Sequence, residues 1–132
     1  CNIKRCVVEN DPKEKGERAL LNFGHTIGHA IEKTKNFSLL HGECVSIGIN
    51  AASYISYKKG FITKDQYHEI LDVIETSDIK AKEVVEATLN DKKMDSGIIK
   101  FIVANSIGEA SINREISKND LLESVKKVIV NE

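Results

Sequence analysis

Helical spacing of apolar side chains dominates the first half of the sequence. Between Glu14 and Lys35 the apolar residues recur at mixed three- and four-residue spacings, which predicts a helix with one buried side. From Gly42 to Tyr57 they occupy nearly every side, as is typical of a central, buried helix. The segment from Thr63 to Gln66 has the spacing of a capping box, and an amphipathic pattern follows it. We expect a third helix there that ends near Thr76.

The second half of the sequence changes period. The segment from Lys82 to Asn90 supports a shorter helix. Ile99, Phe101 and Val103 then alternate with Lys100 and Ile102, and a turn sequence at 106–109 precedes a second short run, which predicts a β-hairpin. Ser117 can cap a last helix with a buried apolar stripe. The predicted class is therefore mainly α with one β-hairpin.

Length and composition narrow the possible roles. A chain of 132 residues suits one compact domain, which we expect to span residues 1–132. The formal net charge of −1 leaves no basic excess for nucleic acid, and no apolar run approaches the roughly 20 residues that cross a bilayer. Three cysteines without paired spacing argue against a disulfide framework and favour the cytoplasm. Because the sequence starts at Cys1 and not at Met, we expect a piece of a longer protein.

Histidines are the strongest chemical signal in the sequence. Three of the four lie between positions 25 and 41. On a helix, His25 and His29 would face the same way, so both could reach one metal ion or anion. Gly24 and Gly28 each cost roughly 1 kcal/mol relative to alanine inside a helix, which suggests that a ligand or another backbone approaches closely there. The alternative is that each imidazole is hydrogen-bonded in a partly polar core.

A longer motif surrounds these histidines. It reads Glu14-x-Gly16-x-Arg18-x-x-Leu21-Asn22-Phe23-Gly24-His25-Thr26-x-Gly28-His29-Ala30-x-Glu32, and then Leu40-His41-Gly42-Glu43. This motif resembles the signature of the 3-dehydroquinate synthase family, and Asp91-Lys92-Lys93 before the hairpin resembles a later segment of the same family. The family joins an N-terminal nucleotide-binding α/β domain to a mainly helical C-terminal domain. The resemblance implies that this chain is the second domain and lacks the first.

The resemblance also implies roles for individual residues. His25 and His41 would bind Zn²⁺ or Co²⁺, with a glutamate of the missing domain as third protein ligand; the helical spacing alone had suggested His25 and His29. His29 would instead face the leaving phosphate of the substrate. The remaining residues that the resemblance places around that phosphate are Lys4, Arg18, Asn22 and one of Lys92 and Lys93, with Glu14 orienting the cations.

The implied reaction converts 3-deoxy-D-arabino-heptulosonate 7-phosphate to 3-dehydroquinate and phosphate. It is a carbon–oxygen lyase reaction of the shikimate pathway, which leads to the aromatic amino acids. Family members use NAD transiently, and most contacts to NAD come from the missing domain, consistent with the lack of a Gly-x-Gly-x-x-Gly loop here. We therefore expect the chain alone to be inactive. We also expect the complete enzyme to be a homodimer.

Two other functions fit parts of the sequence. Other sugar-phosphate cyclases and metal-dependent polyol dehydrogenases of the same superfamily carry metal-binding histidines on similar helices, although the cationic residues favour a phosphorylated substrate. A non-catalytic metal-binding module could instead use three histidines and Cys44 as a closed structural site. His68 lies outside the motif, and we expect it to be solvated.

Overall fold

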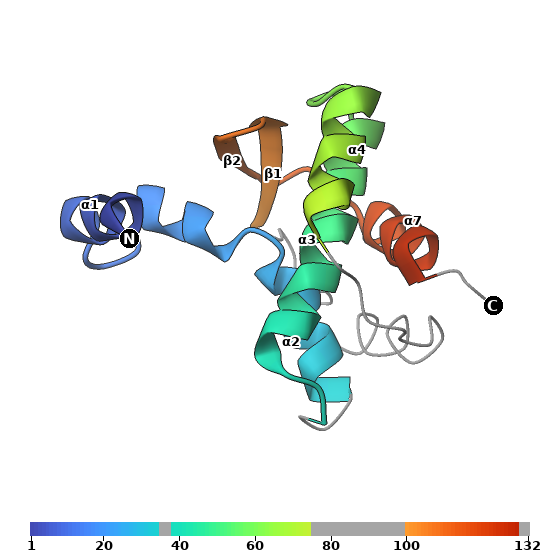
Figure 1. Cartoon of the computed structure of the whole chain (residues 1–132), viewed down its shortest axis with the longest axis horizontal. Helices are drawn as coiled ribbons and strands as arrows, with labels where there is room; N and C mark the ends of the chain where they lie inside the picture. Colours follow the sequence, from blue (N-terminus) through green and yellow to red (C-terminus); the bar gives the residue numbers. More distant parts are fainter. Residues whose placement is uncertain (35–37, 75–99, 130–132) are drawn as a thin grey trace.

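A computed structural model of the chain describes residues 1–34, 38–74 and 100–129 (Figure 1). Its elements in chain order are the helices α1 (Asn2–Asn10), η1 (a 3₁₀ helix, Glu17–Asn22), α2 (His25–Thr34), α3 (His41–Lys58) and α4 (Lys64–Val73), the strands β1 (Phe101–Ser106) and β2 (Glu109–Asn113), and the helix α7 (Lys118–Ile129). The predicted class, mainly α with one β-hairpin, is confirmed. Within the described residues, no helix is long and apolar enough to cross a membrane.

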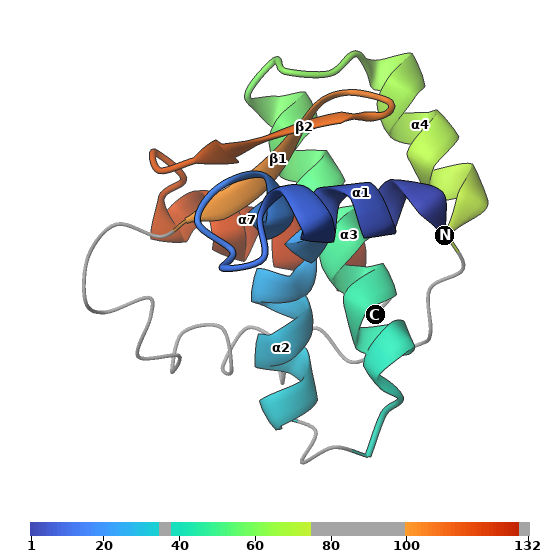
Figure 2. The ribbon, with the colours of Figure 1, turned by 90° about the vertical axis from the view of Figure 1, so that its left-hand side faces the viewer.

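Helix α3 is the centre of the fold. It packs against α2, α4, β1 and α7, and in both views α2 lies beside its first half and α4 beside its second half (Figures 1 and 2). The main core gathers apolar residues from α2, α3, β1 and α7 and from the segment before α7: Ile27, Ile31, Cys44, Ile47, Ala51, Ala52, Ile55, Phe101, Val103, Ile116, Leu121 and Val125. The prediction of a central, buried helix in this region is therefore confirmed.

The helix predicted from Glu14 to Lys35 is wrong in its first half. The chain forms the 3₁₀ helix η1, breaks at Phe23 and Gly24, and only then enters α2. Gly24 has a φ of 79°, a left-handed conformation that ends a helix and that glycine adopts without steric cost. The apolar spacing continues across the break and so does not reveal it, although none of the described residues of η1 is buried.

The structure differs from the prediction in two other helices. Residues Asn2–Asn10 form α1, which was not predicted as a helix, and none of its described residues is buried. Helix α4 ends at Val73, before the predicted end near Thr76, because Ile74 is already extended. The helix predicted at 82–90 lies outside the described residues.

Both predicted helix caps are formed. At α4, Thr63 Oγ1 accepts from the Gln66 N–H at 3.2 Å, and the Gln66 side chain accepts from the Thr63 N–H at 2.9 Å. At α7, Ser117 Oγ accepts from the Asp120 N–H at 3.1 Å, and Asp120 Oδ2 accepts from the Ser117 N–H at 2.9 Å. These reciprocal bonds satisfy N–H groups that a helix leaves unpaired at its start.

The predicted hairpin is confirmed as the antiparallel pair β1 and β2, with Phe101 opposite Asn113 and Ala104 opposite Ala110. Its burial does not alternate, because the four residues from Phe101 to Ala104 are all buried. One face packs into the main core, and Ala104 joins a second apolar cluster with Ile62 and Tyr67. Strand β1 is therefore covered on both faces, unlike a strand with one solvated side.

Candidate metal and substrate site

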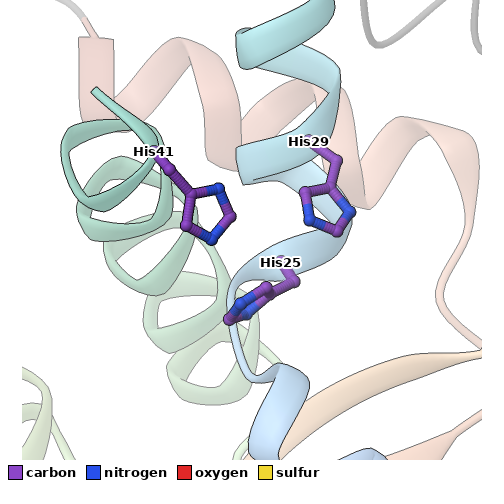
Figure 3. A group of neighbouring side chains, drawn as sticks. All are labelled: His25, His29 and His41. Carbon is purple, nitrogen blue, oxygen red and sulfur yellow. The ribbon is translucent and has the colours of Figure 1, made fainter. Parts of the chain in front are cut away.

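Three histidines converge where α2 and α3 begin (Figure 3). His25 and His29 come from the start of α2, and His41 is the first residue of α3. Their ring centroids are 5.4 Å apart for His25 and His29, 5.6 Å for His25 and His41, and 5.8 Å for His29 and His41. His25 is half-buried while His29 and His41 are exposed, so the cluster is open on one side.

The cluster has the donor set and nearly the spacing of a metal site. One ring nitrogen from each histidine can be chosen so that all three lie within 4.8 Å of one another. Two nitrogens bound at about 2.1 Å to one tetrahedral zinc ion lie roughly 3.4 Å apart, so the ring nitrogens need to approach one another by at most about 1.4 Å. Neutral imidazole suits zinc and cobalt, and a divalent ion therefore fits these residues.

Glycines allow the two helices to bring the histidines together. A Cβ on Gly28 would lie 3.1 Å from both Cys44 O and Val45 Cα of α3. A Cβ on Gly48 would overlap Gly24 O, and one on Gly24 would lie 2.6 Å from Ile49 N. The close approach predicted for Gly24 and Gly28 is confirmed, and the partner is the backbone of α3.

In each of the two histidines predicted to bind metal, Nδ1 lies within hydrogen-bonding distance of an oxygen atom. His25 Nδ1 lies 3.3 Å from the Phe23 carbonyl oxygen, just before α2. His41 Nδ1 lies 3.2 Å from Glu32 Oε1, which comes from the last turns of α2. When each Nδ1 carries the proton, the bond to oxygen is made and Nε2 offers its lone pair.

Cys44 does not complete a closed four-ligand site. Its side chain is fully buried in the main core, and the group of possible metal ligands found among the described residues contains only the three histidines. Burial, together with the nearby charges of Glu32 and Glu43, raises the pKa of the Cys44 thiol. A neutral thiol in a core is a poor ligand, so the geometry favours an open metal site over a structural one.

The polar residues before α2 form a loop and a short helix next to the cluster. Asn22 Nδ2 donates to Glu14 Oε1 at 2.6 Å, and Arg18 Nη1 donates to the Pro12 carbonyl at 2.9 Å. Lys4 is exposed on α1, which packs against η1. Two adjacent elements therefore carry Lys4, Arg18 and Asn22, and the loop between them carries Glu14. Asn22 ends η1 three residues before His25.

Asp11 organises this loop. Its carboxylate accepts from the N–H groups of Lys15, Gly16 and Arg18 at 2.9, 2.8 and 3.1 Å. The bonds from Lys15 and Gly16 are the main reason that the pKa of Asp11 lies below its ordinary value. Glu14 lies inside the same loop with a φ of 52°, a left-handed conformation that non-glycine residues seldom adopt.

Neither Asp11 nor Glu32 was assigned a role from the sequence. Asp11 precedes Pro12, and an Asp-Pro pair is a known signal for the start of a turn. Glu32 follows His29 by three residues, which places the two side chains on neighbouring positions of one helix face. Lys92 and Lys93 lie outside the described residues, and His68 is exposed on α4 beside Tyr67, as predicted.

Comparison with known sequences agrees with the motif. The family model described as 3-dehydroquinate synthase C-terminal matches residues 1–94. A 3-dehydroquinate synthase of Campylobacter concisus is 40% identical over 134 residues, which cover 96% of this chain and 39% of that protein. One from Clostridium botulinum is 46% identical over 122 residues, which cover 83% of this chain and 34% of that protein. The chain thus spans well under half the length of these relatives.

Comparison with solved structures shows the same fold at low sequence identity. A 2-deoxy-scyllo-inosose synthase complexed with carbaglucose-6-phosphate, NAD⁺ and Co²⁺ superposes with a TM-score of 0.76 at 20% identity, covering 94% of this chain and 38% of that one. A 2-epi-5-epi-valiolone synthase from Streptomyces hygroscopicus with NAD⁺ and Zn²⁺ bound gives a TM-score of 0.75 at 20% identity, covering 96% and 37%. By its family match and its relatives, the chain belongs to the 3-dehydroquinate synthase family and corresponds to the C-terminal part of that family.

Proposed function

We propose that this chain is the metal- and substrate-binding part of a 3-dehydroquinate synthase. The complete enzyme, which is this chain joined to an N-terminal nucleotide-binding domain, would convert 3-deoxy-D-arabino-heptulosonate 7-phosphate to 3-dehydroquinate and phosphate. This reaction is a step of the shikimate pathway. The observation that carries the proposal is the convergence of His25, His29 and His41 just after η1, the short helix that bears Arg18 and Asn22, in a chain of this family.

His25 and His41 would hold the metal ion, either Zn²⁺ or Co²⁺. Both ions occur in solved structures of similar fold, one with each. When bound, the ion would polarise hydroxyl groups of the substrate and so stabilise negative charge on their oxygens. The third protein ligand, a glutamate, would come from the N-terminal domain, which leaves a position open to the substrate.

The phosphate of the substrate would lie among Lys4, Arg18, Asn22, His29 and one of Lys92 and Lys93. Arginine offers a bidentate fork to phosphate and lysine a mobile point charge, so such a set can balance the charge of a departing phosphate. Glu14 would orient this set, and its bond to Asn22 Nδ2 supports that role. The exposed His29 could donate a hydrogen bond to a phosphate oxygen while the half-buried His25 binds metal.

The partners of the chain are proposed from its short length relative to its relatives. The N-terminal domain would bind NAD, which supplies a transient oxidation of the substrate, and the cleft between the domains would exclude water. We propose that the complete enzyme is a cytoplasmic homodimer that binds neither nucleic acid nor membranes. The net charge of −1 fits this proposal.

A second candidate is another sugar-phosphate cyclase. It is favoured by the solved structures, one of which is an inosose synthase with carbaglucose-6-phosphate bound. A panel of sugar phosphates offered to the complete enzyme distinguishes the two, because each cyclase should release phosphate from its own substrate fastest. A polyol dehydrogenase would instead turn over unphosphorylated polyols and would not depend on Arg18.

The proposal is tested by measuring 3-dehydroquinate and phosphate formation by the complete enzyme. Arg18→Ala should lower kcat/KM by about 10- to 100-fold, because a charge-assisted hydrogen bond contributes roughly 1.5–3 kcal/mol. His41→Ala should remove turnover, while His68→Ala, an exposed histidine on α4, serves as the matched control and should leave it unchanged. Failure of the unaltered enzyme to form 3-dehydroquinate would overturn the proposal.

A further inference from the structure

We propose that Glu32 is a positioning residue for His41, whose carboxylate accepts the Nδ1 proton and thereby directs Nε2 into the histidine cluster. This inference rests on the proposed function, since the directed Nε2 is the atom that would bind the metal. Glu32 lies on α2 and His41 on α3, so the contact between them links the two helices that form the site.

The contact itself is well defined. Glu32 Oε1 lies 3.2 Å from His41 Nδ1, and the exposed fraction is 19% for the Glu32 side chain and 54% for the His41 side chain. The donor is thus the more exposed partner and the acceptor the more buried one. An exposed imidazole at the first residue of a helix has freedom to rotate, so a hydrogen bond from a more buried carboxylate restricts its orientation.

The position of Glu32 on α2 explains why it can reach His41. Glu32 follows His29 by three residues and His25 by seven, spacings that keep all three on one side of a helix. The glycine contacts hold this side of α2 against the start of α3. In Figure 3, one ring nitrogen of His41 points toward His25, the other histidine predicted to bind metal.

Hydrogen bonding at Nδ1 has a chemical consequence for metal binding. A neutral imidazole has one protonated nitrogen and one lone pair, and the acceptor at one nitrogen decides which is which. Histidine ligands commonly donate their second ring N–H to a carboxylate or a carbonyl, which fixes the tautomer and raises the basicity of the ligand atom. Glu32 does this for His41, and the Phe23 carbonyl does it for His25.

The alternative is an ordinary surface ion pair between Glu32 and a protonated His41, which would contribute little. The two interpretations differ in a measurable way. A positioning bond fixes the proton on Nδ1 of a neutral imidazole, whereas an ion pair needs both nitrogens protonated. A positioning bond also predicts that an uncharged oxygen at position 32 keeps part of the effect, because an amide oxygen still accepts a hydrogen bond.

The first test uses ¹⁵N NMR of the metal-free 132-residue chain at about pH 8.5, two units above the ordinary histidine pKa. Imidazole nitrogen shifts report which nitrogen carries the proton. We expect His41 to be protonated at Nδ1 in the unaltered chain, and to shift toward the Nε2-protonated form in Glu32→Ala. A His41 that is protonated at Nε2 in the unaltered chain would overturn the inference without any variant or any metal.

The second test measures Co²⁺ affinity of the same chain by its visible absorption. Glu32→Ala should weaken binding by about 10- to 100-fold, the usual cost of losing such a partner, and Glu32→Gln should weaken it less. The matched control is Glu43→Gln, which removes the same charge near His41 while its amide oxygen can still accept from the Leu40 N–H, as Glu43 Oε2 does at 2.9 Å. Equal losses in Glu43→Gln and Glu32→Ala would overturn the inference.

These outcomes separate the inference from the proposed function. If the unaltered chain binds Co²⁺ independently of His25 and His41, the metal site fails and the proposed function fails with it. If binding depends on both histidines but is indifferent to Glu32→Ala, only the role of Glu32 is refuted. Circular dichroism of each variant, which we expect to be unchanged, establishes that the fold is kept.

Discussion

At the scale of single residues, Asp11 has the clearest structural effect outside the histidine cluster. Three backbone N–H groups donate to its carboxylate, and one of them belongs to Arg18. Without this acceptor, the loop that carries Glu14 and leads into η1 would lose its main anchor. The proposed phosphate-binding residues therefore depend on a side chain that need not touch the substrate.

The charge on Asp11 predicts a pH dependence of stability. Its pKa in the folded chain lies below the ordinary value of 3.8, so the folded state binds this proton less readily than the unfolded state. The stabilisation is present above pH 3.8 and is lost as the pH falls from there through the lowered pKa. Asp11→Asn should lower the free energy of unfolding at neutral pH, and the difference from the unaltered chain should shrink in acid.

Urea unfolding at a series of pH values measures this difference. Asp72→Asn, which alters an exposed carboxylate on α4, is the control and should show a smaller effect at neutral pH. A difference between Asp11→Asn and the unaltered chain that stays constant from neutral pH to well below pH 3.8 would contradict the assignment.

At the scale of elements, the approach of α2 to α3 decides whether a site exists. Gly28→Ala places a methyl group 3.1 Å from the α3 backbone, which must move to accommodate it. Overpacking of this kind costs about 1–3 kcal/mol, and the higher helix propensity of alanine offsets up to roughly 1 kcal/mol. We expect a net loss of stability and weaker Co²⁺ binding, because His41 moves away with α3.

Gly42→Ala is the matched control for Gly28→Ala. Gly42 lies in the first turn of α3, and a Cβ there meets no heavy atom within 4 Å. Thermal unfolding should show no loss of stability for Gly42→Ala. Equal behaviour of the two variants would mean that close helix packing does not determine the geometry of the site.

A buried hydroxyl connects α3 to the hairpin. Ser56 Oγ donates to the Ala52 carbonyl at 2.8 Å and accepts from the Ala104 N–H of β1 at 2.9 Å. Ser56→Ala leaves that buried N–H without its acceptor, so we expect a loss of about 1–3 kcal/mol in the free energy of unfolding. Ser124→Ala is the control, since Ser124 Oγ donates to Leu121 O within its own helix. A loss as large in Ser124→Ala would contradict this explanation.

At the scale of the whole molecule, the chain supplies only part of the proposed active site. The 132-residue chain, given NAD and Zn²⁺, should release no phosphate from 3-deoxy-D-arabino-heptulosonate 7-phosphate above background. Catalysis by positioning requires all reacting groups to be held together, and the nucleotide site and third metal ligand are proposed to lie on another domain. A phosphate-release assay checks this, and release that His25→Ala abolishes would show that the chain is sufficient alone.

The helices and the hairpin could be predicted from the sequence better than the contacts between them. The buried α3, the caps at Thr63 and Ser117, and the hairpin depend on local patterns that the structure keeps. The break at Gly24 was not predicted, because the apolar spacing continues across it and the close approach of Gly24 to Ile49 is a contact between elements that no local pattern records. Helix α1 was not predicted either, since none of its described residues is buried to give a clear pattern.

The candidate site shows the same limit. Helical spacing could pair His25 with His29, but His41 lies beyond the end of α2, and only the family resemblance associated it with His25. The contact between Glu32 and His41 likewise depends on how two helices pack, which no local pattern records. The role of Asp11 could have been predicted, because Asp11 precedes Pro12 and an Asp-Pro pair favours the start of a turn.

The most direct test of the proposed metal site is a Co²⁺ titration of the complete enzyme carrying single histidine variants. We predict one tightly bound ion per chain. His25→Ala and His41→Ala should each weaken binding by more than the roughly 10- to 100-fold expected for an outer partner, while His29→Ala and the control His68→Ala should bind nearly as tightly as the unaltered enzyme. Loss of the ion in His29→Ala with retention in His41→Ala would contradict this assignment. It would instead support a site formed by His25 and His29, the pair that helical spacing alone suggests.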